Sequence, residues 1–301
     1  MSTNKEKEEI INIGKKTTRI NAKIKAHGKR YLLPLEGREI EIVHYSASHD
    51  HAPMIFGMHG GGFLYGGCAC DDRMWDDMRN RLDVNIISIG YRKTPEHPFP
   101  DALYDVYDAM LYVLHHMPKL LFDRDRICVF GNSAGSTLAA AVCLLAKKKG
   151  GPVIRGQLLN YPFLDLATDP LEKGESEEEL FISRLFNELY VADADPKNPL
   201  ISPVFARDLS GLPKAVIMVC EHDPLRAEGE LYAKRLKEAG VPVSLYLAKD
   251  MQHAFFEQNY AKPLPTDPQY ILDLRASGRM KEESDKTLQH IQDQLKELSI
   301  F

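Results

Sequence analysis

The sequence lacks a long apolar run and a recognisable targeting segment. Its longest apolar stretch, residues 138–146, is much shorter than the roughly 20 residues that a helix needs to cross a bilayer. Residues 1–30 alternate lysine with glutamate and contain no apolar core of the kind found in secretory signals. These absences predict a soluble, cytoplasmic protein without a membrane partner.

Neither sign of charge dominates the chain, and cysteine is scarce. The formal net charge of −5 gives no basic footprint for nucleic acid or for an anionic membrane. The five cysteines are an odd number, which suits a reducing compartment better than a disulfide framework. Cys68 and Cys70 form a C-x-C pair, which is poor evidence for zinc without a second pair of cysteines or histidines. We therefore expect neither a metal nor a cofactor.

The chain does contain short apolar runs that alternate with longer amphipathic stretches. Such alternation is typical of a mostly parallel, doubly wound α/β sheet with helices on both faces. We expect buried strands at residues 54–58, 84–89, 126–130, 154–159, 215–220 and 241–247. Strands at 31–35 and 39–45, joined at Glu36–Gly37, predict an antiparallel hairpin at the sheet edge. No repeat or linker is visible, so one domain over residues 1–301 is expected.

Three segments depart from this alternation. Residues 5–30 predict one or two amphipathic helices that are interrupted at Gly14. Residues 165–209 hold an acidic tract, a helix at 180–190 and several prolines, which indicates an insertion or cap. Near the end, one apolar stripe predicts a terminal helix, formed by Leu288, Ile291, Leu295 and Leu298.

The stretch Phe130–Gly135 has the form of a nucleophile elbow. It lies between an apolar strand and an alanine-rich helix, and it contains the pattern G-x-S-x-G. Gly131 and Gly135 allow a strand to reverse tightly into a helix, which leaves Ser133 at the apex of the turn with its hydroxyl exposed. Because small residues also begin helices for packing reasons, the pattern needs a base and oxyanion donors elsewhere in the chain.

The base and its carboxylate are expected on loops that follow later strands. In a parallel sheet, such loops leave the carboxyl ends of the strands and meet at one edge. Asp223 precedes Pro224 in the first of these loops, and His253 lies in the second, at residues 249–253. The order Ser133, Asp223, His253 is the order that accompanies a nucleophile elbow. Glu221 is a lesser candidate for the carboxylate.

A second glycine-rich loop, residues 59–63, follows the strand expected at 54–58. Backbone N–H groups can point into a cavity where no Cβ is in the way, and a tetrahedral intermediate needs such donors. We expect an oxyanion hole formed by Gly61, Gly62 and the amide of Ala134. A phosphate cradle is the alternative, but no Lys-Ser/Thr pair follows the glycines.

Five motifs occur in one order: His59–Phe63, Tyr91–Pro100, Gly131–Gly135, Asp223–Arg226 and His253. Over residues of about 40–260, they resemble the hormone-sensitive-lipase-like carboxylesterases of the α/β-hydrolase fold. The resemblance implies hydrolysis of short-chain carboxylic esters, from acetyl to hexanoyl, through an acyl-enzyme without metal or cofactor. It also implies a small cap formed by about residues 1–30 and 165–209, and a structural role for His59.

The sequence differs from the family pattern at three positions in or next to these motifs. Asn132, Ser136 and Ala227 replace the usual aspartate, glycine and acidic residue, respectively. None of them removes a catalytic atom. A carbohydrate or xenobiotic acetyl esterase with the same triad stays open, and a ligand-binding protein or a serine peptidase on the same fold is disfavoured. The sequence does not fix the oligomeric state, and a homodimer stays open.

Overall fold

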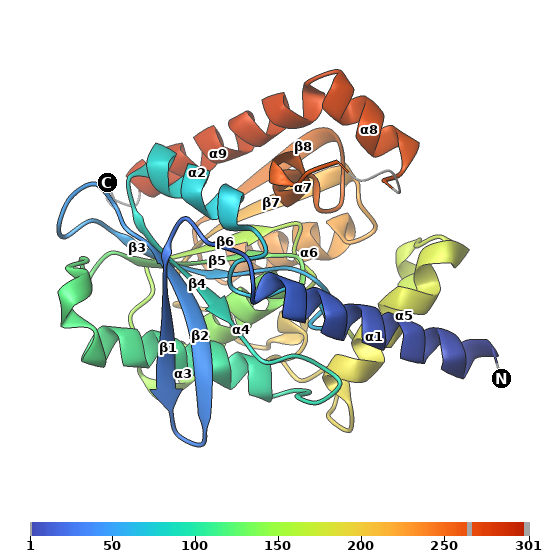
Figure 1. Cartoon of the computed structure of the whole chain (residues 1–301), viewed down its shortest axis with the longest axis horizontal. Coiled ribbons are helices and arrows are strands. Elements are labelled where there is room, and N and C mark those ends of the chain that lie inside the picture. Colours follow the sequence, from blue (N-terminus) through green and yellow to red (C-terminus); the bar gives the residue numbers. More distant parts are fainter. Residues whose placement is uncertain (1, 264–266, 298–301) are drawn as a thin grey trace.

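The computed structural model describes residues 2–263 and 267–297 and contains one eight-stranded sheet (Figure 1). The strand order is β1-β2-β4-β3-β5-β6-β7-β8, in which β2 runs antiparallel to both of its neighbours and the other pairs are parallel. The strands are β1 Lys29–Leu35, β2 Arg38–Tyr45, β3 Met54–Met58, β4 Asn85–Gly90, β5 Ile127–Asn132, β6 Gly156–Asn160, β7 Lys214–His222 and β8 Val243–Gln252. The predicted α/β-hydrolase fold is confirmed.

Helices cover both faces of the sheet and bury two apolar cores. One core contains side chains of α3, α4 and α6, and the other contains side chains of α2, α7, α8 and α9. The bounds are α2 Asp72–Leu82, α3 Asp101–His116, α4 Ala134–Lys149, α6 Arg226–Glu238, α7 Phe255–Tyr260, α8 Gln269–Ala276 and α9 Arg279–Glu297. The central strand β3 is buried along its whole length, which explains why it reads as an unbroken apolar run.

The N-terminal segment differs from the expectation at two points. One continuous helix, α1, runs from Ser2 to Asn21, so Gly14 does not interrupt it. A Cβ at Gly14 would lie 2.8 Å from Leu64 Cγ, so this glycine lets the helix pack against the chain that follows the glycine loop. The residues after Asn21 are not helical, and β1 already begins at Lys29.

The last strand is longer than its apolar pattern indicates. β8 continues through residues 249–252, where a loop is expected, and it pairs with β7 as far as His222 opposite Gln252. An irregularity between Cys220 and His222 shifts the register there. This pairing brings the residues that follow the two strands together.

The insertion at residues 165–209 forms a short 3₁₀ turn at Pro170–Lys173, helix α5 Glu177–Val191 and a second turn at Pro203–Phe205. Helix α5 lies beside α1, far from it in sequence, and Lys7 pairs with Glu188 across the two helices (Figure 1). A further 3₁₀ turn follows α3 at Pro118–Leu120.

The terminal helix α9 packs against β8, β7 and α7. Three residues of the expected stripe, Leu288, Ile291 and Leu295, are buried, and Leu298 lies outside the described residues. Within the described part of the chain, no helix is long and apolar enough to cross a membrane.

Candidate active site

The turn between β5 and α4 holds Ser133 in a conformation that few non-glycine residues adopt. Its φ and ψ are 51° and −120°, which costs free energy unless the surroundings enforce it. A Cβ at Gly131 would lie 2.2 Å from the carbonyl carbon of Gly135, and a Cβ at Gly135 would lie 2.2 Å from Met58 O. Both glycines are therefore required by close backbone packing, and together they hold the serine at the apex.

Strand register brings Ser133, Asp223 and His253 to one edge of the sheet. Each residue directly follows a strand: Ser133 follows β5, Asp223 follows β7 and His253 follows β8. Because His222 pairs with Gln252, the carboxylate and the imidazole emerge side by side. Asp223 and His253 are 30 residues apart in the chain, and the parallel pairing of β7 with β8 brings them together.

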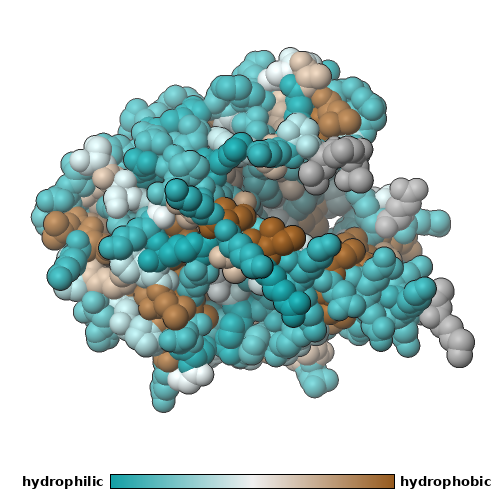
Figure 2. Space-filling model, viewed as in Figure 1, coloured by the Kyte–Doolittle hydropathy of each residue, from teal (hydrophilic) through white to brown (hydrophobic). Residues whose placement is uncertain are grey.

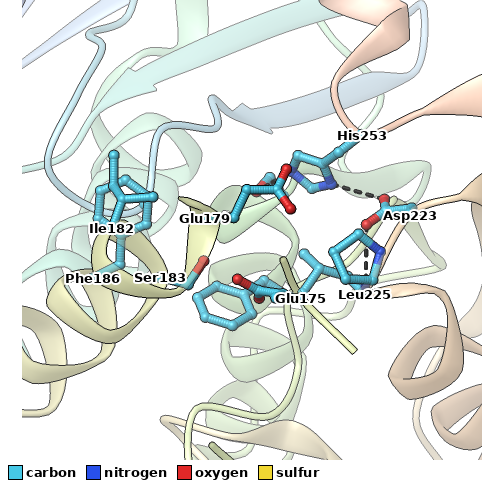
Figure 3. Close-up of a pocket in the computed structure, with 12 residues that line it drawn as sticks. Glu175, Glu179, Ile182, Ser183, Phe186, Asp223, Leu225 and His253 are labelled. Atoms are coloured by element: carbon cyan, nitrogen blue, oxygen red, sulfur yellow. Dashed lines mark hydrogen bonds and ion pairs between the residues drawn. The ribbon is translucent and has the colours of Figure 1, made fainter. Parts of the chain in front are cut away.

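The three side chains form a continuous hydrogen-bonded chain. His253 Nε2 lies 2.9 Å from Ser133 Oγ, and His253 Nδ1 lies 2.8 Å from Asp223 Oδ2 (Figure 3). The other carboxylate oxygen, Oδ1, accepts a hydrogen bond of 2.9 Å from the Leu225 amide. An imidazole held in this way can take the serine proton while the carboxylate fixes its tautomer.

The lesser carboxylate candidate, Glu221, lies elsewhere. Glu221 Oε2 accepts a hydrogen bond of 2.9 Å from the Asp250 amide, and no bond joins it to His253. Its carboxylate groups with His222 and Asp250, whose possible ligand atoms lie within 4.8 Å of one another. His222 is exposed, and the three side chains are separate from the serine pocket.

The environment of His253 raises its pKa. Burial alone lowers the pKa, but the Asp223 carboxylate more than offsets this through its charge and its hydrogen bond. Two further carboxylates, Glu175 and Glu179, add to the increase through their negative charge. Both come from the insertion, so the proton affinity of the imidazole depends on a segment far away in sequence.

The glycine loop passes directly against the elbow. A Cβ at Gly60 would lie 3.5 Å from Ser133 Cβ, and Gly61 and Gly62 have φ values of 110° and 57°. A side chain at Gly62 would meet the ring of Phe186 at 2.4 Å, because α5 packs onto the loop. Ala134 is the first residue of α4, where N–H groups have no partner inside the helix. The glycine loop and the start of α4 therefore lie next to Ser133.

His59 lies at the start of the glycine loop but does not face the pocket. It is fully buried, stacks on Tyr91 with 4.3 Å between ring centroids, and its Nδ1 bonds to Gly60 O at 2.7 Å. Burial and the nearby charge of Lys93 hold its pKa well below the usual range, so the ring is neutral. These contacts fit the structural role that the family resemblance implies for it.

The Tyr91–Pro100 motif is anchored to α3 by charge. Arg92 Nε lies 2.9 Å from Asp105 Oδ2, and the Arg92 amide donates to the same oxygen at 2.9 Å. Arg38 from β2 reaches Asp105 from the other side at 2.6 Å. Asp105 is fully buried, so this carboxylate fixes the loop that supports His59 and Tyr91.

A cavity of about 190 Å³ opens in front of Ser133. The Asp223 and His253 side chains form one side, and α5 provides Ile182, Ser183 and Phe186 (Figure 3). Phe163 and Leu225 complete the apolar wall. The cavity is therefore small, has an apolar wall, and includes Ser133 in its lining.

Glu175 and Glu179 also line this cavity, and sequence reasoning did not single them out. They belong to the acidic tract 174–179, which is typical of solvated surface. A helical signal was available, because residues 179, 182, 183 and 186 follow the i, i+3, i+4, i+7 spacing of one face. That face combines a carboxylate, a hydroxyl and two apolar groups, which is unusual for a plain packing face.

Behind His253, a second buried network was also missed. Tyr161 packs edge-on against the imidazole with 5.0 Å between ring centroids, and its hydroxyl donates to Glu257. Burial, and then the charge of Asp71, raise the pKa of Glu257 well above its usual range. Burial raises the pKa of Asp71 to about 6, although hydrogen bonds from Cys70 and Asn132 lower it. This network links the back of the imidazole to the residue before the serine.

The two cysteines of the C-x-C pair lie away from the triad. Cys68 Sγ is 3.4 Å from Glu41 and 3.8 Å from Arg30, and burial raises its pKa to about 12. Burial likewise raises the pKa of Cys70 well above its ordinary value. Thiols of this kind are poor nucleophiles and poor metal ligands.

Comparison with known proteins agrees with the geometry. Residues 55–257 match a family described as alpha/beta hydrolase fold. An arylesterase of Saccharolobus solfataricus is 34% identical over 229 residues, which cover 74% of this chain and 75% of the relative. The carboxylic ester hydrolase LipN of Mycobacterium tuberculosis is 36% identical over 235 residues, which cover 74% of this chain and 62% of the relative.

Among solved structures, a hyperthermophilic esterase from Pyrobaculum calidifontis superimposes with a TM-score of 0.79. It is 28% identical, and the match covers 100% of this chain and 93% of that one. Fold, motif order and relatives therefore agree. The chain belongs to the hormone-sensitive-lipase-like esterases of the α/β-hydrolase fold.

Proposed function

We propose that this carboxylic ester hydrolase cleaves small, short-chain esters through an acyl-enzyme formed on Ser133. The observation that carries the proposal is the unbroken hydrogen-bonded chain from Ser133 through His253 to Asp223 at the base of a small cavity. His253 accepts the serine proton as Oγ attacks the ester carbonyl, and the resulting imidazolium is stabilised by Asp223. The same imidazolium then protonates the leaving alcohol, and water repeats the sequence on the acyl-enzyme.

The oxyanion of each tetrahedral intermediate is held by the amides of Gly61, Gly62 and Ala134. The positive φ values of the two glycines and the helix-start position of Ala134 support this assignment. Such fixed donors act where charge develops in the transition state, and each is worth on the order of 3 kcal/mol.

Residues of about 1–30 and 165–209 act as the cap in this proposal, within one α/β-hydrolase domain. The contacts that support it are the cavity lining provided by α5 and the ion pair between α1 and α5. We further propose a cytoplasmic location, because all five cysteines are free thiols as in a reducing compartment.

The test is hydrolysis of p-nitrophenyl butyrate by purified protein and by Ser133→Ala. The wild-type protein should turn the ester over, and the variant should lose roughly 10⁴-fold or more in kcat while retaining its circular dichroism spectrum. Because Ser133 lies half-buried at the apex of a turn and not in the apolar core, the fold should survive. If the variant keeps more than about a tenth of the wild-type kcat, Ser133 is not the nucleophile.

A further inference from the structure

The cavity in front of Ser133 carries more negative charge than the ester chemistry requires. Beyond Asp223, its lining includes the carboxylates of Glu175 and Glu179, and within the described residues it includes no lysine or arginine. A negative wall disfavours the oxyanion that forms during ester cleavage, because like charges repel. Two extra carboxylates at this place therefore need a physical reason of their own.

Glu175 is held in an arrangement that is incomplete without a ligand. The residue is only 8% exposed, and its side chain is bonded to the Ser183 side chain. Its other oxygen, Oε2, is buried and has no hydrogen-bond partner in the part of the chain that the structure describes. A buried carboxylate oxygen without a partner is costly, and a positive group in the cavity removes that cost.

Two basic side chains act on Glu175 through their charge, Lys173 and His253, and the lysine is already engaged elsewhere. Lys173 Nζ pairs with Glu228 Oε2 at 3.2 Å and also donates to the Asp165 carbonyl. It lies over the ring of Phe163, 5.2 Å from the centroid, and is not part of the cavity lining. Lys173 is therefore no dedicated counterion for Glu175, whose basic neighbour in the cavity lining is the His253 imidazole.

Glu179 places a second carboxylate beside the catalytic imidazole. It projects from the first turn of α5 toward His253, and the Ser176 hydroxyl donates to its Oε2 at 2.8 Å (Figure 3). Since His253 must approach the oxygen of the leaving alcohol, the substituent on that oxygen lies next to this carboxylate. The two glutamates thus border the alcohol side of the reacting ester.

Building on the esterase function proposed above, we propose that Glu175 and Glu179 form a subsite for alcohol portions that carry a positive charge, such as an ammonium group. The cation lies between the two carboxylates and supplies the charge that Oε2 of Glu175 lacks. The apolar side chains of Ile182 and Phe163 accept the methylene or methyl groups around the nitrogen. The glutamates determine specificity, and they take no part in proton transfer to the serine.

The test compares two acetate esters of equal shape. Acetylcholine and 3,3-dimethylbutyl acetate differ by a charged nitrogen in place of a carbon. The wild-type protein should show about tenfold higher kcat/KM for the charged ester, and this preference should shrink between about 0.05 M and about 0.5 M NaCl. In Glu175→Gln and Glu179→Gln, assayed at a pH above the acid limb of the profile, the ratio of kcat/KM for the charged ester to kcat/KM for the neutral ester should fall several-fold.

Glu177→Gln is the matched control, because Glu177 is an exposed carboxylate of the same segment that does not line the cavity. It should keep the full preference. Equal kcat/KM for the two esters, or a preference that both glutamine variants retain, overturns the subsite and leaves the esterase function intact. If the neutral ester and p-nitrophenyl butyrate are also not cleaved, the esterase proposal fails and the subsite fails with it.

Discussion

At the scale of single residues, Glu221 and Asp223 are two acids at the end of β7 with only His222 between them. Only Asp223 bonds to His253, and Glu221 bonds instead to the Asp250 amide. Asp223→Asn should keep the fold and lower kcat by roughly 10⁴-fold, because the amide favours the wrong imidazole tautomer. Glu221→Gln should lose less than about threefold. Steady-state kinetics on both variants decide the assignment, and the opposite order of effects contradicts it.

The pH dependence of kcat/KM depends on His253, which must be neutral to accept the serine proton. Its pKa is raised by Asp223 and further by Glu175 and Glu179, so activity falls as the pH drops through this raised value. Glu179→Gln removes one negative charge, lowers the pKa of His253 and should shift the acid limb of the profile to lower pH. Glu177→Gln should leave the limb in place. If the acid limb of Glu179→Gln stays in place or moves to higher pH, the charge of Glu179 does not act on the imidazole.

The hydrogen-bonded group of Ser133, Asp223 and His253 was predictable from the sequence, whereas the glutamates of the cavity were not. Ser133, Asp223 and His253 lie next to strands that can be read from apolar runs, and the rule that parallel strands end at one edge joins them. Glu175 and Glu179 lie in an acidic tract, and no local pattern says that one turn of it faces a cavity. That information appears only when α5 is packed onto the glycine loop through Phe186 and Gly62.

At the scale of elements, one buried ion pair joins the insertion to α6. Lys173 in the 3₁₀ turn and Glu228 in α6 are 9% and 6% exposed at their side chains. Burial raises the pKa of Glu228 from its ordinary 4.5 to about 8, although Lys173 lowers it. Because the pKa of Glu228 is higher in the folded state, protonation of its carboxyl group favours the folded state. This contribution to stability is complete below about pH 4.5 and is lost as the pH rises to about 8.

Glu228→Gln should therefore flatten the pH dependence of stability. The free energy of unfolding is measured by urea denaturation at pH 5 and at pH 9. Its decrease between these two pH values should be smaller in the variant than in the wild type by roughly 2–4 kcal/mol. Glu230→Gln, an exposed acid on the same helix that pairs with Arg226, is the control and should follow the wild-type curve. Parallel curves for Glu228→Gln and wild type contradict the raised pKa.

Element boundaries were predicted less well than element types, for identifiable reasons. The low helix propensity of glycine predicts a break at Gly14. In the structure Gly14 packs closely against Leu64, and this tertiary packing outweighs the low propensity. Strand β8 extends past its apolar run through residues 249–252 because pairing with β7 continues to Gln252. Backbone pairing with a neighbour leaves little trace in the hydrophobic pattern of the strand itself.

At the scale of the whole molecule, Ser133 lies in a cavity that α5 lines, and α5 in turn is joined to the N-terminal helix. The Lys7–Glu188 pair makes this connection between α5 and α1. The face in Figure 2 is mostly hydrophilic, and its apolar residues form small separate groups instead of one broad patch. Among the residues that the structure describes, that face shows no extended apolar surface of the kind that docks on lipid.

From the size of the cavity we expect a preference for short acyl chains. Its volume of about 190 Å³ is below the roughly 300–1,000 Å³ of sites for drug-sized ligands. Each buried methylene is worth roughly 0.8 kcal/mol, but only while it finds room inside the cavity. Across p-nitrophenyl esters from acetyl to dodecanoyl, kcat/KM should therefore peak between about two and six carbons, and it should show no jump where the substrate begins to form micelles.

Phe186 tests whether the cavity itself imposes this preference. Its ring contacts the backbone at Gly62 and forms part of the cavity wall. Phe186→Ala removes the ring and lengthens the cavity, so the optimum should move toward longer chains while kcat for the acetyl ester falls by less than about tenfold. Phe181→Ala, on the same helix but outside the cavity lining, should keep the wild-type optimum. A wild-type peak at ten or more carbons contradicts this preference, because such a chain needs an apolar surface that the walls of the cavity do not provide.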